Sequence, residues 1–423
     1  MKSVKQILFL LCFLTAPGVV YGQSLDSLTG LAVTVSPKLK MLQAKTEVAA
    51  SRVEQNSNLP DPTLTLGLAN LPVNSFSFTQ EPMTGKIVGL SQGIPFPGKL
   101  GAVAEAASKD VDIVKQEYDD SKNEIIKNVR QSYYELSYIR KAISVEKESK
   151  NLLSDIAKVV RTKYEVSTAS QQNLLKVELE LTNISDKIQD LKSKEASINA
   201  DLNAQLLLPS DNLIVTREIP DISFRKYTVE DLDSLAVQNR AYLKGFRLAQ
   251  EKAALQENLA KYDRYPNFNL SLQYSQRDEI AKTNTPLTDF FSVMVGISLP
   301  LNYGGKTSAK IQETESLQEM YAQQYSLAQQ VLAQNFGSSV AKLNSLEQRI
   351  KLIKEAEYPQ AQQTFNSALS SYQTGQIDFI NVIDSQSKLY QVETNLYRLK
   401  TDYLKEIAGL EFLTGSDLNE NLK

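Results

Sequence analysis

Histidine and tryptophan are absent from the 423-residue sequence, and its one cysteine, Cys12, lies in a short apolar segment near the N-terminus. Without histidine, the Ser-His-Asp triad of serine hydrolases cannot be assembled. Metal sites built on imidazole or thiolate are excluded as well, which leaves oxygen ligands only, and no cluster of Asp and Glu stands out. We therefore expect no enzyme, no cofactor and no metal site.

The sequence also lacks a strong charge of one sign. Its 46 basic and 49 acidic residues give a net charge of -3, so no nucleic-acid partner is expected. After the N-terminal segment, no run of about 18 apolar residues occurs. A transmembrane helix is therefore not expected.

The N-terminus has the pattern of a secretory signal peptide. Lys2 and Lys5 precede the apolar run 7–14, and small residues follow up to Gly22. We predict a signal peptide over 1–22, with cleavage after Gly22. Because the cysteine lies in the removed segment, the exported chain should carry no disulfide and no lipid anchor.

An internal repeat divides the remaining chain into two similar halves. Three pairs of segments correspond: 58–69 with 263–274, 87–102 with 293–309, and 163–178 with 371–386. Each half predicts a helix, two strands separated by a loop, a very long helix, a tight turn and a further helix. We assign the first repeat to 23–209, a linker to 210–227, the second repeat to 228–415 and a disordered tail to 416–423.

Alternation of apolar and polar residues predicts four strands. They cover 62–69, 86–94, 266–274 and 291–299, and in the third Phe, Leu, Leu and Tyr alternate with Asn, Ser and Gln. Each run has roughly 8–10 residues, about the length of a tilted strand that crosses a membrane. The segments 70–86 and 275–289 are polar and should be exposed loops.

Two helices are predicted to be unusually long. From Lys99 to about Thr162 there is no proline, and at about 1.5 Å per residue this helix measures on the order of 90 Å. The stretch from Gly305 to Tyr372 is similar, except that Pro359 should bend it. The last helix has the three-then-four spacing of a coiled coil at Leu389, Val392, Leu396, Leu399, Tyr403, Ile407, Leu410 and Leu413.

Strands with one apolar face in an exported protein can face lipid, where an unpaired sheet edge is not tolerated. Four strands cannot close a barrel, because about eight is the smallest workable number. Several chains must then share one barrel, and the long helices would continue from it as a tube. Between strand and helix, prolines should end the strands and glycines should allow the turn: Pro95, Pro97, Gly98, Pro300, Gly304 and Gly305.

The repeat, "PDPTLTLGLA" (60–69), "SQGIPFPGKL" (91–100), the turn at 372–386 and "NRAYLKG" (239–245) together resemble the TolC-type outer-membrane efflux proteins. Within that family the first two motifs are most similar to outer-membrane components of heavy-metal efflux systems. The resemblance implies a homotrimer in the outer membrane of a Gram-negative bacterium, with a twelve-stranded β-barrel in contact with outer-membrane lipid and a tunnel of helices in the periplasm. It also implies a periplasmic adaptor protein and an inner-membrane efflux pump of the resistance-nodulation-division type as partners.

The resemblance implies two kinds of functional site. An acidic periplasmic gate falls at Asn381 and Asp384, where the family has two aspartates three residues apart in some members, and Asp378 lies one turn earlier. Contacts with the adaptor fall at the two helical turns. These are Val166, Ser167, Thr168, Ala169 and Ser170 in the first, which lacks the glycine common there, and Thr374, Gly375, Gln376 and Ile377 in the second.

Two short motifs favour other functions but lack necessary residues. Gly89-x-Ser91-x-Gly93 has the nucleophile-elbow pattern, but it lies inside a predicted strand and has no histidine as base. "NYGGKTS" (302–308) is similar to a phosphate-binding loop, but Pro300 stands where that loop needs its first glycine.

The predicted fold is mainly α with a small β part, and the predicted function is the passive exit duct of a tripartite efflux system. The sequence leaves three substrate classes open: metals, drugs and peptides. Two alternatives remain. A periplasmic adaptor protein would have one hairpin in a β-rich body, and a secreted coiled-coil structural protein would not need the four strands.

Overall fold

The computed structural model describes residues 24–167 and 169–418. The predicted signal peptide, Thr168 and the last five residues of the predicted tail lie outside these ranges. Contacts divide the chain into two compact units. We call Lys38–Ser121 with Ala236–Ala333 the sheet unit, and the remainder the hairpin unit. Each unit contains segments from both predicted repeats, so neither unit corresponds to a single repeat.

Both halves of the chain have the same order of elements. The first half contains α1 (Leu25–Val35), α2 (Pro37–Ser57), β1 (Thr63–Ala69), β2 (Gly85–Ile94), α3 (Lys99–Glu165) and α4 (Gln171–Gln205). The second contains α5 (Val229–Asn239), α6 (Ala241–Tyr262), β3 (Asn267–Gln276), β4 (Phe290–Ser298), α7 (Lys306–Leu352), α8 (Tyr358–Gln373) and α9 (Phe379–Thr414). The predicted mainly α fold with a two-fold repeat is confirmed.

Each half begins with two helices where the sequence predicts one. In the first half the break lies at Ser36, directly before Pro37, which is the first residue of α2. Proline has no N–H to donate, so it fits the first turn of a new helix better than the interior of an old one. In the second half the break lies at Arg240, whose backbone is extended.

The four strands form one antiparallel sheet in the order β1-β2-β3-β4. Its register aligns Leu64, Leu90, Leu272 and Val293 across all four strands. Because side chains alternate along a strand, one face of the sheet is mostly apolar, and its polar members are Lys86, Gln92 and Gln276. The other face carries mostly Ser, Thr, Asn and Gln together with the glycines Gly67, Gly85, Gly89, Gly93 and Gly296, and its large apolar members are Ile87, Phe290 and Met294.

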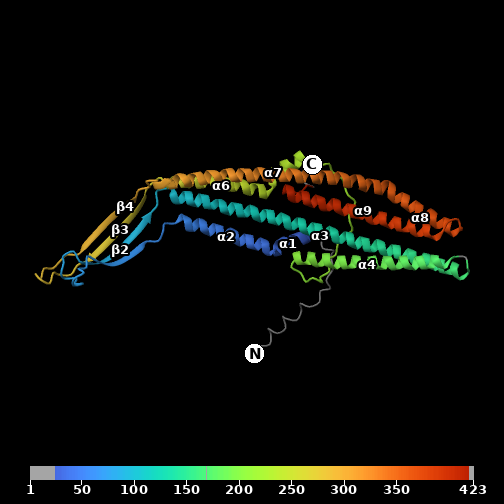
Figure 1. Cartoon of the computed structure of the whole chain (residues 1–423), viewed down its shortest axis with the longest axis horizontal. Coiled ribbons are helices and arrows are strands. Elements are labelled where there is room, and N and C mark those ends of the chain that lie inside the picture. Colours follow the sequence, from blue (N-terminus) through green and yellow to red (C-terminus); the bar gives the residue numbers. More distant parts are fainter. Residues whose placement is uncertain (1–23, 168, 419–423) are drawn as a thin grey trace, which may run out of the picture. The chain divides into compact units, whose positions relative to one another are not determined.

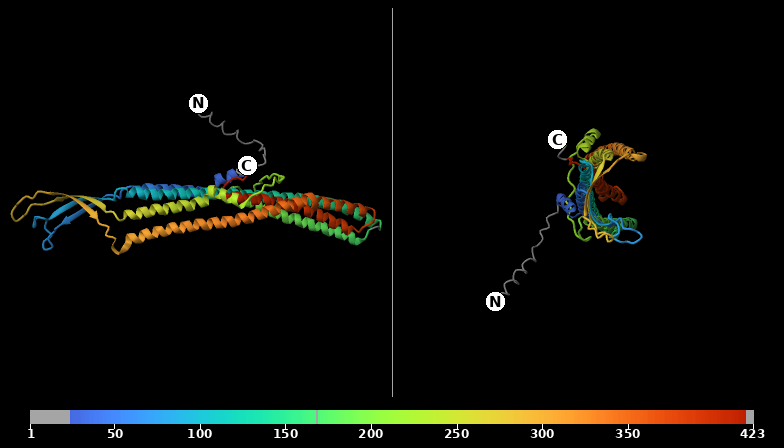
Figure 2. Two further views of the ribbon diagram at one scale, coloured as in Figure 1. Left: turned by 90° about the horizontal axis from the view of Figure 1, so that it is seen from above. Right: turned by 90° about the vertical axis from the view of Figure 1, so that its left-hand side faces the viewer.

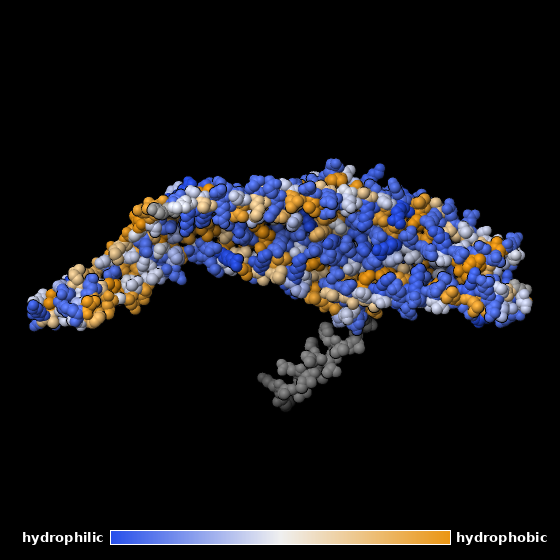
Figure 3. Space-filling model, in the orientation of Figure 1, coloured by the Kyte–Doolittle hydropathy of each residue, from blue (hydrophilic) through white to orange (hydrophobic). Residues whose placement is uncertain are grey.

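The apolar face of the sheet is not covered by the chain itself. Its outer leucines, valines and isoleucine are 55% to 71% exposed: Leu64, Leu66, Leu68, Val293, Val295 and Ile297. Figure 3 shows apolar side chains gathered over the strands. An exposed apolar surface of this extent marks a contact with lipid or with another protein.

The Gly89-x-Ser91-x-Gly93 motif belongs to the polar face of β2. The Ser91 hydroxyl donates to Asn269 Oδ1 at 2.7 Å across the sheet. It lies mid-strand instead of at the strand-to-helix turn that a nucleophile elbow requires. Its small residues are therefore explained by the sheet.

In the sheet unit, α2, α6 and the first parts of α3 and α7 run side by side away from the strands (Figures 1 and 2). Ion pairs hold α6 against α3, with Lys109 Nζ 2.5 Å from Glu251 and Lys252 Nζ 2.6 Å from Asp110. No helix among the described residues combines the length and the hydrophobicity needed to cross a bilayer.

The hairpin unit consists of two antiparallel helix pairs, the later part of α3 with α4 and α8 with α9 (Figures 1 and 2). One of its apolar clusters includes Leu28, Val129, Leu136 and Leu202, all at most 1% exposed. On α9 the predicted seam is partly right. Five of its eight residues are buried, but polar Glu411 and Thr414 are buried too.

The second long helix is interrupted before its proline. A π-helical turn occupies Ile353–Glu357, and the Tyr358 N–H donates to the Ile353 carbonyl. Pro359 cannot donate to the carbonyl of Glu355 and its ring would clash with it, so the backbone widens in the preceding turn. The sequence predicts a bend at Pro359, and the structure has a π-helical turn at Ile353–Glu357, a few residues before that proline.

A partly buried carboxylate joins α3 to α9. Glu135 accepts from Arg398 at 2.6 Å and from Lys405 at 2.7 Å. Burial alone would raise the pKa of Glu135, but the bonds from Lys405 and Arg398 outweigh it, and the pKa lies below its ordinary value of 4.5. The ionised form is therefore favoured in the folded chain.

We expect Glu135→Gln to lower the free energy of unfolding at pH 7 by about 1–3 kcal/mol, because Lys405 loses its charged partner and Arg398 keeps only Asp402. Since the folded pKa is depressed, this stabilisation is present above pH 4.5 and is lost as the pH falls through the folded pKa. Denaturant unfolding at pH 7 and at acid pH measures it. Glu148→Gln, an exposed site on the same helix, is the control and should change stability by less than about 0.5 kcal/mol. Equal losses at both pH values would contradict the charge argument.

Candidate gate, hairpin turns and junction

The three predicted gate residues lie on one exposed face of α9. Asp378 is the N-cap residue of this helix, and Asn381 and Asp384 follow at intervals of three. The exposed stripe continues through Lys388, Gln391 and Asn395. The opposite face of the same turns buries Phe379, Val382 and Ile383. The structure thus brings the three predicted residues onto a single polar stripe.

Two contacts that sequence reasoning missed hold this part of α9. Gln386 is 1% exposed, and its Nε2 donates to the Ser149 carbonyl at 2.9 Å and to the Ser149 hydroxyl at 3.1 Å. Lys388, one turn beyond Asp384 on the stripe, lies 3.0 Å from Glu357. A glutamine within an otherwise apolar helix face was the available signal for the first contact.

The two predicted turns have matching backbones. In the second, Gly375 has φ of 76°, its N–H donates to the Tyr372 carbonyl at 3.1 Å, and the Gln376 N–H donates to the Ser371 carbonyl at 2.8 Å. These are the bonds of a Schellman cap. In the first, Ser167 takes the place of the glycine with φ of 60°, and Ser170 caps α4. A non-glycine residue pays a steric cost in this left-handed region.

The turns are linked to each other inside the hairpin unit. Lys163 Nζ lies 3.4 Å from the Tyr372 carbonyl oxygen and 4.3 Å from the centre of its ring. The Tyr372 ring in turn lies 5.1 Å from that of Phe379 at the start of α9. Around this link, Val166, Thr374, Gly375 and Gln376 are exposed. The two turns therefore form one surface.

The predicted junction residues lie between strand and helix in both halves. Pro95, Pro97 and Gly98 follow β2, and Gly98 has φ of 88° directly before α3. After β4 come Pro300, Gly304 (φ of 70°) and Gly305 (φ of 76°), directly before α7. The sequence did not indicate Asn302, which is also left-handed and accepts a bond from the Thr307 N–H at 2.9 Å.

A cavity of about 420 Å³ lies at this second junction, and we call it the junction pocket. Its lining includes Lys99, Asp263, Lys306 and Lys310. Asp263 accepts from Lys99 at 2.8 Å and from Lys310 at 2.6 Å. Burial would raise the pKa of Asp263, but the bonds from Lys310 and Lys99 hold it below its ordinary range.

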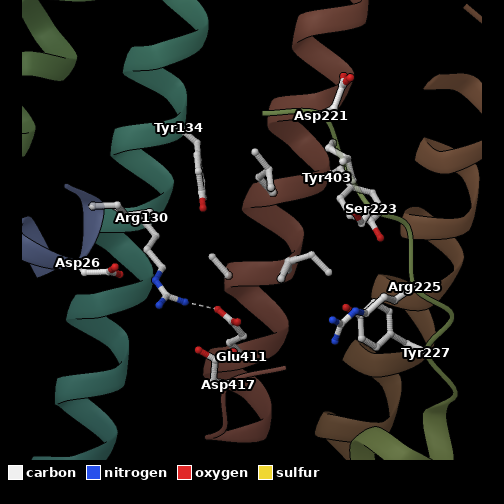
Figure 4. Close-up of a pocket in the computed structure, with 15 residues that line it drawn as sticks. Asp26, Arg130, Tyr134, Asp221, Ser223, Arg225, Tyr227, Tyr403, Glu411 and Asp417 are labelled. Atoms are coloured by element: carbon white, nitrogen blue, oxygen red, sulfur yellow. Dashed lines mark hydrogen bonds and ion pairs between the residues drawn. The ribbon is translucent and has the colours of Figure 1, made fainter. Parts of the chain in front are cut away.

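A second cavity, of about 500 Å³, lies in the hairpin unit between α3, α9 and the segment before α5. Figure 4 shows Arg130 of α3 extended toward Glu411 of α9, with which it forms an ion pair. Burial raises the pKa of Glu411 despite that cation. Burial also raises the pKa of Tyr227 to about 12. The pair joins two helices across the cavity.

Comparisons with known proteins agree on one family. A family model described as "Outer membrane efflux protein" matches residues 28–206 and 232–416. The chain is 21% identical over 448 residues to the outer membrane protein TolC of Vibrio cholerae serotype O1, covering 97% of this chain and 96% of TolC. It is 20% identical over 312 residues to the cobalt-zinc-cadmium resistance protein CzcC of Cupriavidus metallidurans, covering 70% and 69%.

The fold is also shared with solved structures. The outer membrane protein VceC from Vibrio cholerae superimposes with a TM-score of 0.76 at 18% identity, over 93% of this chain and 96% of VceC. At this level of identity the similarity concerns the fold alone.

Exchanging the residues of the two turns tests their backbone equivalence. We expect Ser167→Gly to raise the free energy of unfolding by about 0.5–1 kcal/mol, because glycine adopts positive φ without steric cost. Gly375→Ser should lower it by a similar amount, since a Cβ there meets nothing within 4 Å and only the backbone is strained. Denaturant unfolding measures both. Changes of the same sign would show that the two turns are not equivalent.

Proposed function

The chain belongs to the outer membrane efflux protein family, and from this premise we propose that it forms the exit channel of a tripartite efflux system. Three copies would share one barrel in the outer membrane and continue as a helical tunnel in the periplasm. A periplasmic adaptor and an inner-membrane pump would deliver the substrate. The channel itself would be passive and would catalyse no reaction.

The exposed apolar face of the sheet is the observation that carries this proposal. Within the described residues, β1 pairs only with β2 and β4 only with β3, so both outer edges have backbone groups without a partner in this part of the chain. In lipid such edges must be paired. Joining β4 of one copy to β1 of the next satisfies both, and three copies give twelve strands, above the minimum of about eight.

The polar face of the same sheet suits the inside of a barrel. Its glycines and small hydroxyl side chains leave room on the side that curves inward. Ser91, Asn269 and Ser271 are hydrogen bonded to one another there. In the proposed assembly these residues face the solute, and the leucines and valines face lipid.

The polar stripe on α9 supports a gate at the periplasmic end. In the proposed trimer, three copies of Asp384 would meet near the axis, with Asn381 and Asp378 adjacent. Lys388 is neutralised by Glu357, so the stripe retains carboxylate charge. Opening would move the N-terminal part of α9 relative to helices other than α3. The Gln386–Ser149 bond means that α9 and α3 would move together.

The surface formed by the two turns supports the adaptor as a partner. It is exposed and lies next to the gate stripe, because the second turn ends directly before Asp378, the first residue of that stripe. Contact there could change the position of α9 directly. We assign the choice of substrate, whether metal, drug or peptide, to the pump and the adaptor.

The oligomeric mass of the mature chain tests the shared barrel first. Extracted from outer membranes in mild detergent, the protein should have the mass of a trimer after the detergent is subtracted. A water-soluble monomer or dimer would mean that the apolar face does not meet lipid, and the channel would be rejected.

Adjacent substitutions in β4 separate the two faces. Val293→Arg places a cation on the lipid face near the middle of the strand and should destabilise the trimer by about 2–4 kcal/mol per chain. Ser292→Arg places the same cation on the polar face and should leave the trimer assembled. Urea unfolding and the fraction of trimer in outer membranes measure the effect. Equal loss in both variants would contradict the assignment of faces.

Removing the gate carboxylate should weaken cation binding in the lumen. We expect Asp384→Asn to reduce cation selectivity and to weaken block by multivalent cations several-fold in single-channel recordings, because three charges are lost from one narrow ring. Asp190→Asn, on the exposed side of α4, is the matched control. Unchanged selectivity and block in the first variant would remove Asp384 from the gate.

A further inference from the structure

The junction pocket holds more positive charge than it neutralises. Lys99 and Lys310 share the single carboxylate of Asp263. Lys306 is exposed and has no ion pair within residues 24–167 and 169–418. The three ammonium groups that line the cavity thus exceed its one carboxylate by two charges.

Backbone dipoles add to this charge. Lys99 is the first residue of α3, and Lys306 is the first residue of α7. The N-terminal end of a helix carries a partial positive charge from its unpaired N–H groups. Asn302 caps one of these groups, Thr307 N–H, and its amide nitrogen lies 3.1 Å from the Ser308 hydroxyl oxygen. Two helix ends and three lysines therefore meet at one cavity.

We propose that the junction pocket binds an oxyanion of the phosphate class. Its volume of about 420 Å³ lies within the usual range of ligand sites. Lys306 supplies an ammonium that is free to form charge-assisted bonds, and Lys310, nearly half exposed, can turn toward the same anion while Lys99 keeps Asp263.

A phosphate group could reach the pocket from two sources. Leu299 and Leu301 are 70% and 76% exposed and continue beyond the end of β4, which suits the headgroup of an anionic phospholipid. Asn267 and Ser298 are opposite each other on the polar face of the sheet and also line the pocket, which suits a soluble anion. The distinction between these sources rests on the proposed function, because it takes the apolar face to meet lipid.

The experiment compares the wild-type protein with Lys306→Gln/Lys310→Gln. The matched control is Lys176→Gln/Lys192→Gln, which removes two α4 lysines for which the structure gives no ion pair. Inorganic phosphate is titrated calorimetrically at low ionic strength. In parallel, native mass spectrometry counts the phosphatidylglycerol and phosphatidylcholine molecules that each assembly retains. In at least one of these two measurements, the Lys306→Gln/Lys310→Gln variant, which we call the pocket variant, should bind phosphate or phosphatidylglycerol about tenfold more weakly than wild type does. The control variant should bind as wild type does.

The phosphate titration and the lipid count together identify the source of the bound phosphate group. Loss of phosphate binding in the pocket variant shows a soluble anion, and loss of selective phosphatidylglycerol retention shows a lipid headgroup. The proposal is overturned if wild type binds neither, or if the pocket variant binds as wild type does.

A third variant changes binding in the opposite direction. Asp263→Asn frees Lys99 and Lys310 from their carboxylate, so it should tighten binding several-fold, an outcome that misfolding cannot produce. The oligomeric mass is measured on the same samples. A trimer that binds no anion rejects the pocket alone, and anion binding by a chain that forms no trimer rejects the channel alone.

Discussion

Backbone hydrogen bonding across the four strands determines which environment each side of the sheet can occupy. A shift of one residue in any strand would place polar residues among the leucines, because the side-chain period is two. The observed register avoids this and aligns Leu64, Leu90, Leu272 and Val293. The exposed apolar face, the unpaired outer edges and the proposed sharing of a barrel all depend on that alignment.

The strands and long helices could be predicted because their signals are local. Alternation marked all four strands within one or two residues of their observed ends, and the absence of proline marked α3. The helix breaks at Ser36 and Arg240 and the π turn at Ile353–Glu357 were missed. These features depend on how neighbouring helices pack and on how a proline is accommodated, and periodicity carries little information about either.

The candidate sites also differ in whether a local stretch of sequence can identify them. The turns and the gate stripe lie in continuous segments, so a sequence motif can identify them. The junction pocket joins Lys99, Asp263 and Lys310, which are distant in the sequence and meet only because β2, β3 and β4 are adjacent. Ser167 shows a further limit. Its residue type argues against the left-handed conformation that its turn requires.

The duplicated halves are alike in order but not in detail. The first hairpin has an uninterrupted α3 and a serine in its turn, whereas the second has a π turn and a glycine. A three-fold assembly of such chains would have approximate six-fold symmetry at its helical end, with two non-identical hairpins alternating around the ring. A partner protein would then meet two distinct docking positions per subunit, and one adaptor sequence would have to recognise both.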